Sequence, residues 1–275
     1  MYINTRARAL TITTLVTILF SLFQIKYFDI HIFDSSLINI VIESLIIGSA
    51  VFLGIYWVVE FKLRYMRFFT VALFPAFFAM IFNIFVGLSL YSSIVSIKGG
   101  LLTTLLVIVF TFTLYFLILN ANILNVSSLT GIPLERAAKT AQYIFSLIYC
   151  YLITFVLFSL QLPAVIRLPL LIATLFYLTY QTFWSSLSSI SELFSVTSIL
   201  TLLMVIWVLT ISMWPLTPAF VALLFTTILY ITYGVGLDKL GKISTLSRIE
   251  YVLVLFLVCT FCILTSNWGI NGRII

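Results

Sequence analysis

Nine apolar runs, each close to the roughly 20 residues that a helix needs to cross a bilayer, follow one another along this chain. At a rise of about 1.5 Å per residue, such a run spans the roughly 30 Å of hydrocarbon. We therefore expect an all-α, polytopic helix bundle in the membrane, one transmembrane domain over residues 1–275. The expected spans lie near 8–25, 38–60, 68–92, 101–120, 141–161, 169–187, 190–213, 218–237 and 249–268.

Composition supports the membrane assignment independently of the run lengths. Only 8% of the residues are charged and 63% are hydrophobic, whereas a soluble domain has roughly 25% charged residues. A soluble chain of 275 residues cannot bury that much apolar surface in one core, because its own exterior must be covered by polar groups. In a bilayer, the surrounding hydrocarbon removes this requirement.

The basic residues between the runs predict the orientation of the chain. With a cytoplasmic N-terminus, ten of the 14 basic residues lie on the inner side and four on the outer side, as the positive-inside rule requires. An odd number of spans then places the C-terminus outside, and we expect a multi-pass protein of the plasma membrane. The inner set is Arg6, Arg8, Lys62, Arg64, Arg67, Arg136, Lys139, Lys239, Lys242 and Arg248, and the outer set is Lys26, Lys98, Arg167 and Arg273.

Several functional classes are excluded by what the sequence lacks. The basic residues are dispersed, whereas a nucleic-acid binder clusters them on one face, so no nucleic-acid partner is expected. His31 is the only histidine, which excludes zinc proteases with paired histidines, and no glycine-rich phosphate loop is present. Cys259 and Cys262 are expected to be packing residues rather than metal ligands. We expect no cofactor and no metal, and the sequence leaves enzymatic activity undecided.

Small and polar residues mark the faces on which spans are expected to meet. In the third span a stripe recurs at helical spacing, and its one amide is Asn83 at mid-membrane; its other members are Ala72, Ala76, Ala79 and Gly87. Small residues favour close helix packing in lipid. In the second span Glu43 shares a face with Ala50 and Gly54. An ionisable residue inside a span indicates either a functional site or an interfacial contact, and Glu43 is the leading candidate.

The sixth span carries the longest polar stripe. Thr174 and Tyr177 begin it, and the further members are Gln181, Ser185, Ser188 and Glu192. Polar groups that face lipid are costly, so this stripe must meet protein or water. Two interpretations stay open: the wall of a polar pathway, or interhelical hydrogen bonding. Ser189 and Glu192 also have the spacing of a capping box, although 169–213 could instead contain one long helix and a re-entrant piece.

No motif identifies a reaction, a solute or a family. The interpretation that best fits a sequence with few intramembrane charges is a non-catalytic, membrane-embedded or structural subunit. It would contact membrane lipids and other membrane-protein subunits. The first alternative is a carrier or channel for a small or lipophilic solute that uses Glu43 and the polar stripe. The second is a lipid-modifying enzyme whose site would include the predicted inner segment 121–140.

Overall fold

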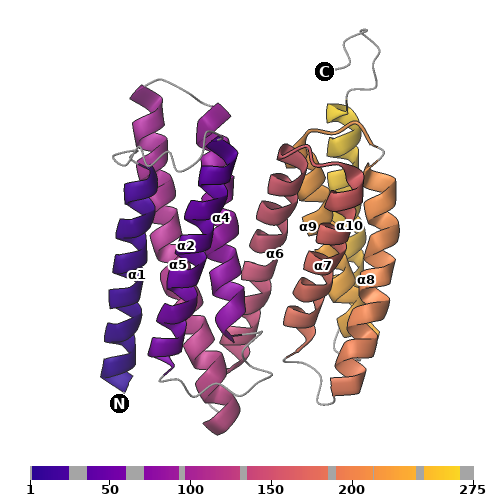
Figure 1. Cartoon of the computed structure of the whole chain (residues 1–275). Helices are drawn as coiled ribbons and strands as arrows, with labels where there is room; N and C mark the ends of the chain where they lie inside the picture. The colour runs from indigo at the N-terminus through magenta and orange to yellow at the C-terminus, as the bar shows by residue number, and fades with distance from the viewer. Residues whose placement is uncertain are drawn as a thin grey trace. The chain divides into compact units, whose positions relative to one another are not determined.

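A computed structural model describes residues 2–24, 36–59, 71–92, 97–130, 135–184, 190–212, 214–239 and 245–266. Within these ranges the regular structure is entirely helical (Figure 1). The helices are α1 (Tyr2–Gln24), α2 (Ser36–Val58), α4 (Leu73–Ser92), α5 (Ile97–Thr130), α6 (Glu135–Ser159), α7 (Ala164–Phe183), α8 (Ile190–Ser212), α9 (Pro218–Lys239) and α10 (Thr245–Thr265).

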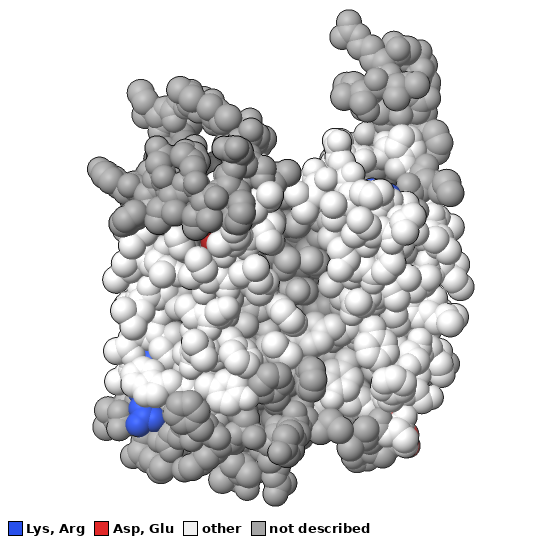
Figure 2. Space-filling view, viewed as in Figure 1, with Lys and Arg blue, Asp and Glu red and all other residues white. Residues whose placement is uncertain are grey.

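Seven of the described helices are long and apolar enough to cross a membrane, namely α1, α2, α5, α6, α7, α8 and α9. The other two, α4 and α10, contribute the shorter apolar stretches Leu73–Leu88 and Ile249–Thr265. Figure 2 shows that the described side chains on the visible face are almost all uncharged, and that the few charged ones lie toward the ends of the helices. The chain is thus a multi-pass α-helical membrane protein.

Several helix limits follow local signals in the sequence. α9 begins at Pro218, where the N–H groups of Phe220 and Val221 both donate to the carbonyl of Thr217. Proline suits this first position because it has no N–H to leave unpaired. The region 169–213 holds two helices, α7 and α8, each long enough to span, so no single long helix runs through it. Ser189 of the expected capping box lies outside the described residues.

Two helices extend beyond their expected spans in a way that relocates polar residues. α5 does not end near residue 120 but continues to Thr130, so that its 34 residues extend roughly 51 Å. Asn120 and Asn122, at and just beyond the end of the expected span 101–120, therefore lie inside the helix. α7 begins at Ala164 rather than near 169, which places Arg167 in its first turn and not in a loop. In both places the helical backbone continues beyond the apolar run.

Unit 1 comprises residues 1–142, and its helices α1, α2, α4 and α5 form a closed ring of neighbouring pairs. α2 and α4 make the most extensive pair. The small-residue stripe of α4 faces α2: a Cβ at Gly87 would meet Ile40 Cγ2 at 3.1 Å, and one at Gly48 of α2 would overlap Met80. Ala72, Ala76 and Ala79 of the stripe are buried. On the other side, the ring of Phe20 in α1 stacks on Phe110 of α5 with centroids 4.2 Å apart.

Unit 2 comprises residues 143–275 and is organised around α9, which contacts α7, α8 and α10. More than half of the central residues of α9 are buried. Close approach depends on Gly236, whose missing side chain leaves room for the ring of Phe183 from α7. Phe183 is itself fully buried with Leu193 and Leu200 of α8. α6 joins α9 through ring contacts, including Phe158 with Phe225 at 6.1 Å.

Candidate functional site

A buried chain of polar groups links three helices of unit 1. Asn83 of α4 is only 1% exposed. Its Nδ2 donates to Ser44 Oγ of α2 at 2.8 Å, and its Oδ1 accepts from Gln24 Nε2 of α1 at 3.0 Å. Ser44 Oγ donates in turn to the carbonyl of Ile40 at 2.7 Å. Both ends of the Asn83 amide therefore bond across helices, at the mid-span position where lipid would leave them unsatisfied.

Glu43 directly precedes Ser44 and is half-buried. It lies eleven residues before Gly54, about three helical turns, so both residues are on one side of α2. That side meets α1, because a Cβ at Gly54 would approach Ile12 Cγ2 to 2.6 Å. Glu43 is thus on the α1 side of α2, next in sequence to the polar chain. Glu43 and Asn83 therefore lie in the same unit: Glu43 precedes Ser44 on α2, and Asn83 of α4 donates to Ser44.

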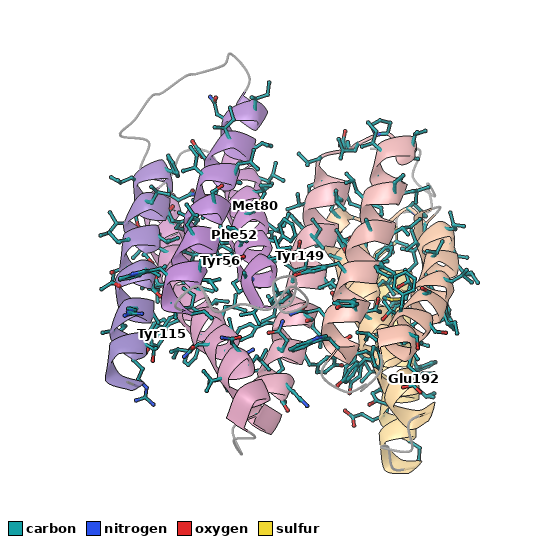
Figure 3. The ribbon with its side chains drawn as sticks, turned by 60° about the horizontal axis from the view of Figure 1, so that its bottom comes forward. Phe52, Tyr56, Met80, Tyr115, Tyr149 and Glu192 are labelled. Carbon is teal, nitrogen blue, oxygen red and sulfur yellow. The ribbon has the colours of Figure 1, made fainter. Side chains whose placement is uncertain are left out.

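The polar stripe predicted along the sixth span is divided by the structure. Gln181 of α7 is buried, with 2% of its surface exposed, and Tyr177 is half-buried. Glu192 lies in the first turn of α8, exposed at the rim of unit 2 rather than among its helices (Figure 3). There its negative charge is favourable beside the positive helix end. Ser185 and Ser188 lie outside the described residues.

The bond between α7 and α8 uses residues that the sequence did not single out. The hydroxyls of Thr179 and Thr201 are 3.0 Å apart and both residues are buried. Thr179 Oγ1 also bonds the carbonyl of Leu175 in its own helix at 2.6 Å. Elsewhere, Asn120 Nδ2 donates to Gln142 Oε1 at 2.9 Å. These two contacts therefore use buried hydroxyl and amide groups to join one helix to another.

A cluster of tyrosines at one end of unit 2 is the main polar feature that the sequence did not reveal. Tyr143 of α6 stacks on Tyr233 of α9 with ring centroids 4.2 Å apart. Tyr230 of α9 meets Tyr251 of α10 edge to face at 5.1 Å. Tyr230 Oη donates to Glu250 Oε1 at 2.9 Å. We call these five residues the tyrosine–glutamate cluster.

The tyrosine–glutamate cluster depends on a glycine. A Cβ at Gly234 would overlap the ring of Tyr251, so only glycine allows α10 to place this ring against α9. A Tyr-x-x-Tyr-Gly sequence at 230–234 is the one signal that could have indicated the contact. Chemically, the cluster offers phenol donors and one carboxylate acceptor at a helix end.

The described residues contain no group of three or more His, Cys, Asp or Glu side chains arranged to hold a metal. A shallow groove of about 100 Å³ runs between α8, α9 and α10, with Trp207, Thr232 and Leu255 among its lining residues. Its walls are almost wholly apolar, so it offers shape but little chemistry for a polar solute.

No protein-family model matches this sequence, and neither the curated proteins nor the solved structures contain a significant match.

Proposed function

We propose that this chain is a non-catalytic, membrane-embedded subunit that provides helical structure for other membrane proteins. The observation that carries the proposal is the bonding of Asn83. Its amide, the one polar group of its stripe, is bonded at both its nitrogen and its oxygen, to α2 and to α1. A solute-binding amide would present at least one end to a cavity. The same use of polar groups recurs between Thr179 and Thr201.

The surface of α10 supports the same proposal. This helix makes its main contact with α9, and its side chains on other faces are widely exposed, Phe256 by 73% and Leu264 by 78%. Such a surface suits lipid or a partner helix equally. We also propose that the N-terminus lies in the cytoplasm, on the distribution of basic residues along the sequence, and that the membrane is the plasma membrane.

Purification of the full chain in a mild detergent tests this proposal. A membrane-protein partner is expected to remain bound in fixed stoichiometry through affinity and size-exclusion steps. Substitution of Phe256 by lysine should weaken that association, whereas Phe112→Lys on exposed α5 is the matched control. If the protein is purified from the membrane in which it is normally made and is monodisperse without a partner, the subunit proposal is contradicted.

The second candidate function is a carrier or channel for a small or lipophilic solute. It is favoured by the half-buried carboxyl group of Glu43 on the α1 side of α2. A Glu43→Gln variant that complements a deletion strain as well as the original chain would remove this candidate. The side chains of Glu135 and Arg136, on which the lipid-modifying alternative depends, lie outside the described residues.

A further inference from the structure

Arg167 carries a positive charge at the end of unit 2 opposite the tyrosine–glutamate cluster. It lies in the first turn of α7, and its guanidinium sits over the ring of Phe158 with Cζ 4.4 Å from the centroid. The Nε atom is buried and has no hydrogen-bond partner among the described groups. The ring covers one face of the guanidinium, and because Nε is buried, the terminal Nη groups are the donors left for a group outside the protein.

Among the described side chains of unit 2, no acidic group lies near this arginine. Between Lys139 and Glu192 the sequence contains no other charged residue. The acids of unit 2 are Glu192 at the start of α8, Asp238 at the end of α9 and Glu250 at the start of α10. Because successive helices run in opposite directions, all three belong to the far end of the bundle (Figure 1). The rise from Arg167 to the end of α7 alone is roughly 24 Å.

The start of α7 adds positive potential to that of Arg167. The helix begins after Pro163, and no side chain caps it. Its first turn contains no acidic residue, although the partial positive charge of a helix N-terminus attracts anions. Here a guanidinium and an uncapped helix N-terminus lie together, and their combined positive potential favours binding of an anion from outside unit 2.

The two residues before Arg167 are apolar and exposed, which indicates that this end of α7 faces lipid. Val165 is 84% exposed and Ile166 is 52% exposed, which is favourable against hydrocarbon. The 20 residues of α7 match the roughly 30 Å thickness of the hydrocarbon core. The Cα of Arg167, three residues into the helix, therefore lies roughly 4.5 Å inside the hydrocarbon edge, and its long side chain can extend outward to the lipid phosphates.

We propose that Arg167 binds the phosphodiester of a phospholipid headgroup at the membrane face predicted to lie outside. A guanidinium can donate two parallel hydrogen bonds to a phosphate, which lysine cannot reproduce. The acyl chains of the same lipid would cover the exposed apolar residues Val165 and Ile166. This inference does not depend on the proposed scaffold function.

Native mass spectrometry of the full chain in detergent micelles tests the proposal. The probes are phosphatidylethanolamine and monogalactosyl diacylglycerol with identical acyl chains, because the second lipid lacks phosphate. We expect one phosphatidylethanolamine to bind preferentially, with about tenfold weaker binding in Arg167→Gln. Arg167→Lys should lose part of the affinity. Arg8→Gln is the matched control, because Arg8 also lies over an aromatic ring, 5.7 Å from that of Trp57.

Three outcomes would overturn the proposal. Equal binding of the galactolipid would show that acyl contacts alone retain lipid. An equal loss in Arg8→Gln would show a general charge effect. Displacement of the phospholipid by inorganic phosphate at matched concentration would identify a free-anion site instead. If Arg167→Gln does not fold, the comparison of Arg167→Lys with the original chain decides, since a merely solvated cation would give identical lipid binding in both.

Discussion

The bond between Asn83 and Ser44 should measurably stabilise the packing of α4 on α2. Substituting either residue by alanine removes the 2.8 Å bond from Asn83 Nδ2 to Ser44 Oγ. Interhelical hydrogen bonds in membrane proteins contribute about 0.6 kcal/mol on average and up to about 1.7 kcal/mol. We expect a coupling free energy in this range between the two substitutions, at least roughly threefold in the folding equilibrium constant.

Ser49 provides a control on the same helix. Ser49 Oγ donates to the carbonyl of Leu45 at 2.7 Å, the same local bond that Ser44 makes to Ile40, but Ser49 is exposed. Ser49→Ala should therefore have a smaller effect than Ser44→Ala. It should also show no coupling to Asn83→Ala, because residues without a shared contact behave additively.

The measurement is a double-mutant cycle on reversible unfolding of the full chain in mixed micelles, followed by circular dichroism. A cycle cancels the cavity and the lost Gln24 contact, which both appear equally in the single and double variants carrying Asn83→Ala. If the Ser44–Asn83 coupling were no larger than the Ser49–Asn83 coupling, the assignment of this bond would be refuted.

Three further predictions use the same unfolding assay. Gly54→Ala should destabilise the chain by about 1–3 kcal/mol through overlap with Ile12, and Ile12→Ala should relieve much of that loss; an additive pair would argue against the α1–α2 contact. A double-mutant cycle of Tyr143→Leu and Tyr233→Leu should show about 0.5–1.5 kcal/mol of coupling from their stacked rings. An absence of coupling would show that these two rings do not stabilise the packing of α6 on α9. Thr179→Val and Thr201→Val should couple by about 0.6 kcal/mol, whereas Thr210→Val on the exposed face of α8 should not couple to Thr179→Val.

Patterns within one helix were sufficient to predict the helical fold and the packing face of α4. The alternation of small residues from Ala72 to Gly87 repeats at helical spacing, and the structure packs this stripe on α2. The start of α9 at Pro218 likewise has a local reason, the missing proline N–H. Such features depend only on residues of one helix, so they can be predicted from the sequence without knowing which helices are neighbours.

Features that depend on two helices, or on polar helical residues, could not be read in the same way. The apolar run 101–120 ends at the polar Asn120, but the amide of Asn120 bonds Gln142 and the helix continues. Arg167 suggested a loop for the same reason. The stacking of Tyr143 on Tyr233 joins residues far apart in the sequence, and no periodicity along either helix indicates which helices will be neighbours.

The polar chain through Asn83 also orders the events of membrane insertion. Gln24 and Asn83 are 59 positions apart, so α1 enters the bilayer well before its hydrogen-bond partner has been synthesised. Gln24 is the last residue of α1, and its amide can stay among headgroups and water during that interval. The hydrogen bond between Gln24 and Asn83 can therefore form only after α4 has been synthesised.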